Sequence, residues 1–213
     1  MKKYDYFLLD WDGNLAQTLD IWLEACRIAF ENKGLQLTDT EIAASFGAVV
    51  EHLVRWGVKD IDATVEEMDR LAKQKLLNVT LYPDVLEVLE GLKSADKKLA
   101  LITTSVHENI EHLLDKHHIS HFFDVVIAGD DVRHHKPHPE PLEKALQRLG
   151  VHDKNQAVMI GDSDKDLGAA TNAEIDSILF YPPEHRKFYD LGKLKQLHPT
   201  YIVSDFREVL RAI

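Results

Sequence analysis

The feature that most constrains the fold of this chain is a series of short, continuously apolar runs separated by longer amphipathic segments. The runs are Tyr6–Leu9, Leu99–Ile102, Val125–Ala128, Ala157–Ile160 and Ser177–Phe180, with a weaker one at Tyr201–Val203. A strand that is apolar at every position is typical of a parallel sheet covered on both faces by crossover helices. The sequence therefore predicts an α/β fold, in a chain of 213 residues whose 45% apolar content suffices for a buried core.

The alternation of strands and helices is interrupted once, before the helix predicted to begin near Pro83. A block of about 70 residues there has helical periodicity and no convincing strand. The predicted helices carry Leu19, Leu23, Cys26, Ile28, Ala29 and Phe30 in one case and Val65, Met68, Leu71, Ala72, Lys75 and Leu76 in another, with shorter helices at Glu41–Phe46 and Val49–Trp56 flanking Gly47. Such a block can close as a small bundle. We therefore predict a helical cap domain at residues 17–79, inserted into a core formed by residues 1–16 and 80–213.

Several helix starts are indicated by their capping residues. Ser105 with Glu108, and Thr38 with Glu41, both fit the capping-box pattern. Pro83 is expected in the first turn of the helix that follows the cap. These signals place the Ser105 segment at a helix N-terminus directly after a strand.

The charge and the cysteine content exclude several classes of partner. A formal net charge of -11, spread along the chain, argues against a nucleic acid or an anionic membrane as the main partner. The single cysteine, Cys26, cannot form an intramolecular disulfide, and the first apolar run is too short for a signal peptide. No run approaches the length of a membrane helix. We expect a cytoplasmic protein, present as a monomer or weak homodimer.

Two carboxylates follow the first strand in the segment Asp10–Trp11–Asp12–Gly13. Ligands of open α/β sheets bind at the carboxyl ends of the strands, so Asp10 is a candidate nucleophile toward phosphorus and Asp12 a candidate acid-base catalyst. Gly13 permits a sharp exit from the strand. A calcium loop also begins with such acids, but it ends in a glutamate where this chain has Ile21. A pair of solvated loop acids is the other alternative.

A hydroxyl segment and a lysine follow the next two strands. Thr103, Thr104 and Ser105 end the second strand, where hydroxyls and backbone N–H groups can bind phosphate, although ordinary helix capping explains them as well. Lys136 follows the third strand and could neutralise both a phosphate and an attacking carboxylate, unless it is an exposed loop lysine. Thr103, Thr104 and Lys136 are thus the candidate phosphate-binding residues.

A second acidic pair, Asp162 and Asp166, follows the fourth strand. With Asp10 and the backbone carbonyl of Asp12, these residues would supply the oxygen ligands that Mg²⁺ prefers. Acids that favour a helix dipole are the plainer interpretation, but they do not explain why four strands in turn end in groups suited to one phosphate and one cation. Asp164 and Lys165 are expected to face away.

The histidine-rich stretch containing His134, His135 and His138 is a possible metal site by residue type. No cysteine and no spaced second pair of ligands completes a structural zinc site in the sequence. We therefore interpret these residues as polar loop histidines.

Taken in order, these four motifs resemble those of the haloacid dehalogenase-like hydrolases, over nearly the whole chain. Asp10–Trp11–Asp12–Gly13 resembles the nucleophile motif, Thr103 the Ser/Thr motif, Lys136 the lysine motif, and Gly161–Asp166 the acidic motif. The resemblance implies a Rossmann-like core with a helical cap of the phosphoglycolate phosphatase and β-phosphoglucomutase type. Three positions depart from the family pattern: Asn14 replaces a threonine, Gln17 an aspartate, and His135 a glycine.

The resemblance implies a Mg²⁺-dependent phosphatase that hydrolyses a small phosphomonoester through an aspartyl-phosphate. The second acid, Asp12, favours phosphate esters over dehalogenation or phosphonate chemistry. Two alternatives stay open: a phosphosugar mutase, which would need a cationic cap residue such as Arg55 or Lys59, and a non-enzymatic phosphometabolite-binding protein on the same fold. A phospho-accepting signalling module would leave the cap unexplained.

Overall fold

The computed structural model describes residues 1–46 and 48–213, and its centre is one six-stranded parallel sheet. Neighbouring strands follow the order β3-β2-β1-β4-β5-β6, and every pair is parallel. The strands are β1 (Tyr6–Asp10), β2 (Lys98–Ile102), β3 (Val125–Ile127), β4 (Ala157–Gly161), β5 (Asp176–Phe180) and β6 (Tyr201–Val203). The predicted α/β class is confirmed, and each predicted strand is present with its ends shifted by no more than one residue.

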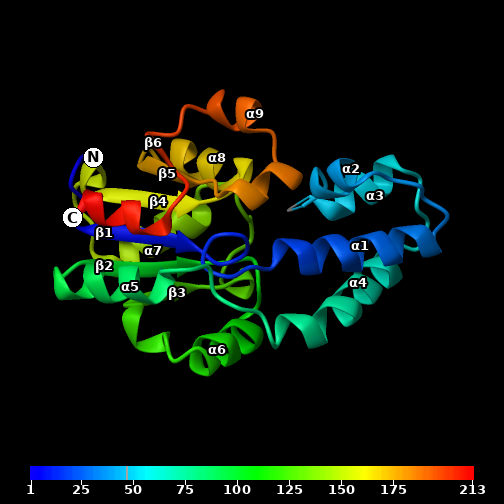
Figure 1. Ribbon diagram of the computed structural model, residues 1–213, viewed down its shortest axis with the longest axis horizontal. Helices are drawn as coiled ribbons and strands as arrows, with labels where there is room; N and C mark the ends of the chain where they lie inside the picture. The colour runs from blue at the N-terminus through cyan, green and yellow to red at the C-terminus, as the bar shows by residue number, and fades with distance from the viewer. Residues whose placement is uncertain (47) are drawn as a thin grey trace.

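Helices cover both faces of the sheet, because successive strand residues point to opposite sides. Leu9 and its neighbours on one face pack against α5 (Val85–Ser94), α6 (His107–Lys116) and the 3₁₀ helix η5 (Phe206–Ala212). Leu8 and its neighbours on the other face pack against α7 (Glu140–Leu149) and α8 (Asp164–Asn172). The remaining short elements are η1 (Ser120–Phe122), η2 (Gly129–Asp131), η3 (Lys154–Gln156), η4 (Pro183–Lys187) and α9 (Leu191–Lys195). The result is a three-layer core (Figure 1).

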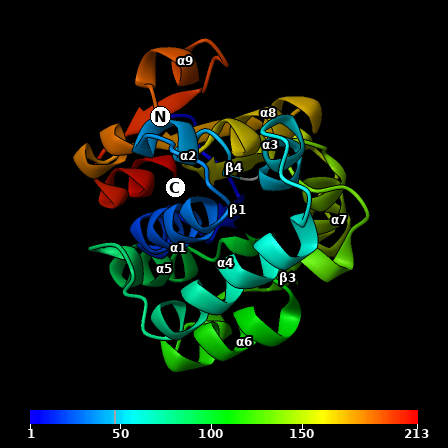
Figure 2. The same cartoon turned by 90° about the vertical axis from the view of Figure 1, so that its right-hand side faces the viewer.

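The predicted cap segment forms four helices that lie beyond the carboxyl end of β1, on the side away from both chain termini (Figures 1 and 2). They are α1 (Leu19–Asn32), α2 (Asp39–Ala43), α3 (Val49–Arg55) and α4 (Ile61–Leu76). These helices share an apolar cluster, which Phe188 of the core joins, and α1 is packed along α4. The boundaries 17 and 79 stay a prediction, and Gly47, expected between two cap helices, lies outside the described residues. No helix in the described ranges is long and apolar enough to cross a membrane.

The chain passes between the core and the four cap helices twice, and the two crossings are bonded to each other. The backbone N–H of Gln17 donates to Thr80 O, and its side-chain Nε2 donates to Leu81 O, both at 2.9 Å. The N–H of Tyr82 donates to Leu15 O at 2.9 Å. Gln17, one of the departures from the family pattern, therefore joins the two crossings through its amide.

Among the apolar residues that mark the predicted helix, Ile28 is 37% exposed, because the buried stripe of α1 runs through Leu23, Cys26 and Phe30. Two local expectations were wrong. Ser105 does not form a capping box: α6 begins at His107, whose N–H donates instead to the carboxylate of Asp130. Pro83 precedes the N-cap of α5 rather than occupying its first turn. The capping box of Thr38 with Glu41 is confirmed.

Candidate active site

Residues from four strand ends meet at the carboxyl edge of the sheet. Asp10 ends β1, Thr103 follows β2, Lys136 lies in the loop between η2 and α7, and Asp162 follows β4. Because β2, β1 and β4 are adjacent in a parallel sheet, their carboxyl ends lie side by side. All four side chains are buried, as is that of Asp166 in the first turn of α8. The predicted groups therefore converge on one desolvated site.

Lys136 forms the centre of a buried ion triad. Its Nζ lies 2.5 Å from Oδ1 of Asp10 and 2.6 Å from Oδ1 of Asp166, and it also donates to the carbonyl of Ile102 at 3.4 Å. Burial alone lowers the pKa of a lysine, but the two carboxylates outweigh it and the pKa of Lys136 is raised. Lys136 is thus a buried lysine paired with two carboxylates rather than an exposed loop lysine.

The carboxylates of Asp10, Asp162 and Asp166 can hold a divalent cation. Oxygen atoms of the three lie within 4.8 Å of one another. Oδ2 of Asp162 is buried and has no hydrogen-bond partner among the described residues. Burial raises the pKa of Asp10 to about 8, although Lys136 acts in the opposite direction, and burial with the charge of Asp166 raises that of Asp162. Three buried carboxyl groups that are costly to ionise together, one with an unpartnered oxygen, fit a hard cation such as Mg²⁺, which would offset their negative charge.

The side chain of Asp12 lies apart from this cluster. Its Oδ1 accepts a hydrogen bond of 3.1 Å from Nε1 of Trp22, a residue of helix α1. Burial raises the pKa of Asp12, while the bond from Trp22 lowers it. Asp12 was predicted among the metal ligands, and with its carboxylate turned to Trp22 the contribution expected of it is its backbone carbonyl. One of the predicted catalytic acids is therefore held by a residue from the cap segment.

Gly13 is required by both its backbone and its surroundings. Its φ is +73°, and a Cβ at this position would lie 2.2 Å from Oδ2 of Asp162. Only glycine allows the loop after β1 to lie against the acidic loop after β4. The next residue, Asn14, is fully buried and donates from Nδ2 to the carbonyl of Asp10 at 3.0 Å. This departure from the family pattern therefore helps to hold the backbone of Asp10.

The two threonines that follow β2, Thr103 and Thr104, differ in burial. Thr103 is buried, and its Oγ1 accepts from the N–H of Ser105 at 3.1 Å. Thr104 is exposed. Its carbonyl oxygen instead contacts the backbone at Gly129, where a Cβ would come within 2.2 Å of it. Of the two threonines predicted to bind phosphate, the structure places Thr103 at the site and turns the side chain of Thr104 to the surface.

The first turn of α8 orients Asp166. Ser163 and Asp166 form a capping box in which Ser163 Oγ donates to Asp166 Oδ2 at 2.6 Å, leaving Oδ1 for Lys136. The loop carrying Lys136 is tied to the same helix, because Asn172 Nδ2 donates to Pro137 O at 2.9 Å. Asp164 is exposed, in line with the expectation that it faces away from the site, and it forms an ion pair with Lys165 that was not predicted.

Two residues near the site were missed in the sequence. Tyr189 lies close to the carboxylate of Asp162, which together with burial raises the pKa of the Tyr189 phenol. It follows η4, a segment that also contacts the cap helices through Phe188. Trp22 is the second residue that was missed. Neither Trp22 nor Tyr189 belongs to a sequence motif that would have indicated a place near the site. The candidate cationic residues of the cap, Arg55 and Lys59, are both exposed.

Known proteins are similar to this chain in sequence and in fold. A family model described as haloacid dehalogenase-like hydrolase matches residues 7–180. The pyrophosphatase PpaX of Oceanobacillus iheyensis is 28% identical over 213 residues, which cover 97% of this chain and 95% of that protein. A putative haloacid dehalogenase-like hydrolase from Bacteroides fragilis superposes with a TM-score of 0.85 at 27% identity, covering 97% of this chain and 100% of that one. A putative phosphoglycolate phosphatase from Lactobacillus plantarum shares the fold, with a TM-score of 0.83 at 19% identity and coverage of 99% and 100%.

Proposed function

Because the chain belongs to the haloacid dehalogenase-like hydrolase family, we propose that it is a Mg²⁺-dependent phosphatase of a small phosphorylated metabolite. The observation that carries the proposal is the buried triad of Asp10, Lys136 and Asp166 beside the unpartnered oxygen of Asp162. A lone nucleophilic carboxylate would repel a phosphate dianion. Lys136 offsets part of that repulsion, and a cation held by Asp10, Asp162 and Asp166 would offset more of it.

In the first half of the reaction, Asp10 attacks phosphorus. Lys136 contacts Oδ1 of Asp10, so the attack is assigned to Oδ2. A bond forms between Oδ2 and phosphorus while the bond to the leaving oxygen breaks, and Asp12 donates a proton to that oxygen. The enzyme is left as an aspartyl-phosphate on Asp10, with Asp12 ionised.

In the second half, water releases the phosphate. Asp12 removes a proton from the water as it attacks phosphorus, which regenerates the Asp10 carboxylate and the protonated Asp12. Thr103 and Lys136 bind the phosphate oxygens in both halves. When bound, Mg²⁺ supplies a positive charge that screens the phosphate from the acidic cluster.

Inorganic pyrophosphate is a second candidate substrate. The relative from Oceanobacillus iheyensis that spans almost the whole chain carries the name pyrophosphatase. Attack on pyrophosphate uses the same groups, with phosphate in place of an alcohol as the leaving group. A mutase would need a cationic cap group over the site, and the exposure of Arg55 and Lys59 offers no support for one.

The test is phosphate release from a panel that contains pyrophosphate, phosphoglycolate, sugar phosphates, nucleotides and an aryl phosphate, each with and without Mg²⁺. We expect Mg²⁺-dependent release, and the ratio of kcat/KM for pyrophosphate to that for the best monoester decides between the two substrate classes. No release from any compound would contradict the proposal. Assays for transfer between sugar hydroxyls with a bisphosphate activator, followed by ligand-binding measurements, would then separate a mutase from a binding protein.

A further inference from the structure

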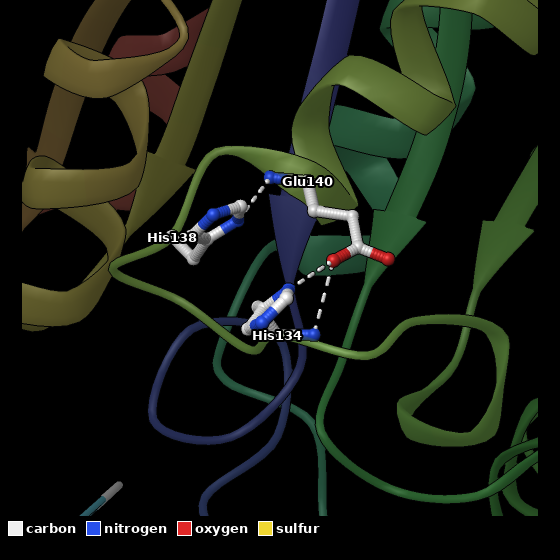
Figure 3. Close-up of side chains that lie close together, drawn as sticks. All are labelled: His134, His138 and Glu140. Atoms are coloured by element: carbon white, nitrogen blue, oxygen red, sulfur yellow. Dashed lines mark hydrogen bonds and ion pairs between the residues drawn. The ribbon is translucent and has the colours of Figure 1, made fainter.

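A second group of metal-binding side chains lies on the loop that carries Lys136, outside the catalytic site. It consists of His134, His138 and Glu140, whose potential ligand atoms lie within 4.8 Å of one another (Figure 3). Nδ1 of His134 is 2.9 Å from Oε2 of Glu140. The rings of His134 and His138 have centroids 4.6 Å apart and are inclined by 30°. We call these three residues the His–His–Glu cluster.

The cluster and Lys136 lie on one short loop but differ in burial. Lys136 is 8% exposed and reaches inward to Asp10, whereas His134 and His138 are exposed and Glu140 is intermediate. Each histidine is two residues from Lys136 along the chain. The cluster therefore shares no ligand with the Mg²⁺ site, and an ion could reach it directly from solvent.

The carboxylate of the cluster is held in place before any ion binds. Oε1 of Glu140 accepts from the N–H of Arg133 at 2.9 Å, and Oε2 accepts from the N–H of His134 at 3.0 Å. His138 is oriented by its Nδ1, which accepts from the N–H of Glu140 at 3.2 Å. Because the Glu140 side chain is already held in place, it loses little conformational entropy when it binds a metal ion.

We propose that the His–His–Glu cluster is a binding site for a transition-metal ion of the Zn²⁺ class. Two imidazoles and one carboxylate suit Zn²⁺, Ni²⁺ or Cu²⁺, whereas Mg²⁺ prefers oxygen ligands alone. The same chain thus carries an all-oxygen site inside and a nitrogen-rich site outside, and the two select different ions. Three protein ligands leave the fourth position of a tetrahedral zinc to water.

The distance between Nδ1 of His134 and Oε2 of Glu140 is close to the separation of two ligand atoms on a zinc ion. Zinc at its usual distances from a nitrogen and an oxygen ligand separates them by roughly 3.4 Å in a tetrahedral site. The two atoms are now 2.9 Å apart, so the ion replaces the shared proton after an opening of about 0.5 Å. A ring nitrogen of His138 is the third ligand, and the bond that its Nδ1 accepts from the N–H of Glu140 is given up, because the single lone pair of the neutral ring is then used by the ion. Because a proton is displaced, Zn²⁺ binds more tightly at pH 8 than at pH 6.

Bound zinc would link residues on both sides of Lys136. His134 lies before the lysine, while His138 and Glu140 lie after it and lead into α7. The ion would therefore close the loop from outside, in addition to the bond that Asn172 makes to Pro137. We expect backbone amides of residues 133–138 to exchange with solvent more slowly when Zn²⁺ is bound.

The test is isothermal titration with Zn²⁺ of the untagged full chain in excess Mg²⁺ at pH 8. Wild type and His135→Gln, which changes a histidine of the same loop outside the cluster, should each bind one equivalent with the same affinity. His134→Gln and His138→Gln should each weaken binding at least tenfold. Circular dichroism of each variant establishes that it is folded.

Two results would overturn the proposal. One is wild-type protein that binds no Zn²⁺ at 100 μM, in which case the three side chains only order the loop and the start of α7. The other is binding that survives in His134→Gln and His138→Gln but is lost in Asp162→Asn, which would place the ion in the acidic cluster. Neither result depends on phosphatase activity, so the metal site and the proposed function can fail separately.

Discussion

The core and the four cap helices differ most in what they bury. In residues 1–46 and 48–213, the buried acidic and lysine side chains are Asp10, Lys136, Asp162 and Asp166, and all four lie at the carboxyl edge of the sheet. The buried polar residues of α2 to α4 and their connections are the uncharged Ser45 and Thr64. Buried charges are costly unless they are paired or bind a cation. The core thus holds the chemistry, while the cap helices hold mainly an apolar cluster and act at the site through few contacts.

The strongest test of this contrast is Asp10→Asn. We expect turnover to fall by a factor on the order of 10⁴, because the amide cannot form the covalent intermediate. The fold should survive, since the exchange removes a buried charge and keeps the shape of the side chain. Phosphate release and thermal unfolding by circular dichroism measure the two effects. Asp164→Asn, the same exchange at an exposed acid, should leave both unchanged, and appreciable turnover in Asp10→Asn would refute the mechanism.

The next largest effect is expected from Lys136→Met. Removing the cation leaves Asp10 and Asp166 buried without a partner, which costs about 3–5 kcal/mol of unfolding free energy. Urea unfolding at pH 8 without Mg²⁺ measures this loss. Lys165→Met removes a lysine that pairs with the exposed Asp164, and it should cost no more than about 1 kcal/mol. Equal losses in the two variants would mean that burial does not distinguish these ion pairs.

A pH-dependent effect is predicted for His185, a fully buried residue of η4 whose Nε2 lies 2.7 Å from the Tyr82 hydroxyl. Burial lowers the pKa of His185 to about 4 from the ordinary 6.5. The unfolded chain therefore binds a proton as the pH falls below 6.5, while the folded protein does not until about 4. This stability is present above pH 6.5 and is lost toward pH 4, up to about 3 kcal/mol.

His185→Gln should remove that part of the pH dependence. Urea unfolding between pH 7.5 and pH 4 should show a shallower loss of stability in the variant than in wild type. His112→Gln, at an exposed position of α6, serves as the control and should follow wild type. Parallel curves for His185→Gln and wild type would show that His185 titrates alike in the folded and unfolded states.

Trp22→Phe tests the contact through which the cap segment acts on the core. Losing the hydrogen bond to Asp12 removes a bond to a charged group, worth about 1.5–3 kcal/mol, so kcat should fall roughly tenfold or more. Because Trp22 lowers the pKa of Asp12, the limb of the pH profile of kcat that reports Asp12 should move to higher pH; this is the basic limb if proton donation limits the rate and the acidic limb if water attack does. Trp56→Phe, at a cap residue that packs on Phe30, should leave the limb in place. If the pH profile of Trp22→Phe matches that of wild type, Trp22 does not affect the pKa of Asp12.

The smallest effect is expected from Arg55→Ala. Its exposure predicts a change in unfolding free energy within about 0.5 kcal/mol and a kcat/KM within roughly threefold of wild type. Kinetics with the best substrate of the panel measure it. A loss above tenfold would mean that Arg55 reaches the substrate when the cap closes, and would weaken the contrast between the two regions.

The sequence predicted which residues meet at the site, but not the hydrogen bonds and side-chain directions there. The positions of Asp10, Thr103, Lys136 and Asp162 at one sheet edge followed from continuous apolar runs, because strand ends in a parallel sheet share an edge. The capping box predicted at Ser105 failed because Asp130, which is distant in sequence, takes the place of the cap. Thr104 could not be separated from Thr103 without knowing which hydroxyl faces inward.

The sequence by itself determined the parallel α/β core, the helical block between its first two strands, and the candidate groups at four strand ends. Local apolarity and residue spacing are enough for these, because the periodicity of a strand or helix is a property of neighbouring residues. Only the tertiary structure decided that Trp22 holds Asp12, that Tyr189 lies beside Asp162, and that two exposed histidines meet Glu140. The first two contacts depend on how separate segments pack, and the third depends on the path of one short loop into α7, which no periodicity along the chain encodes.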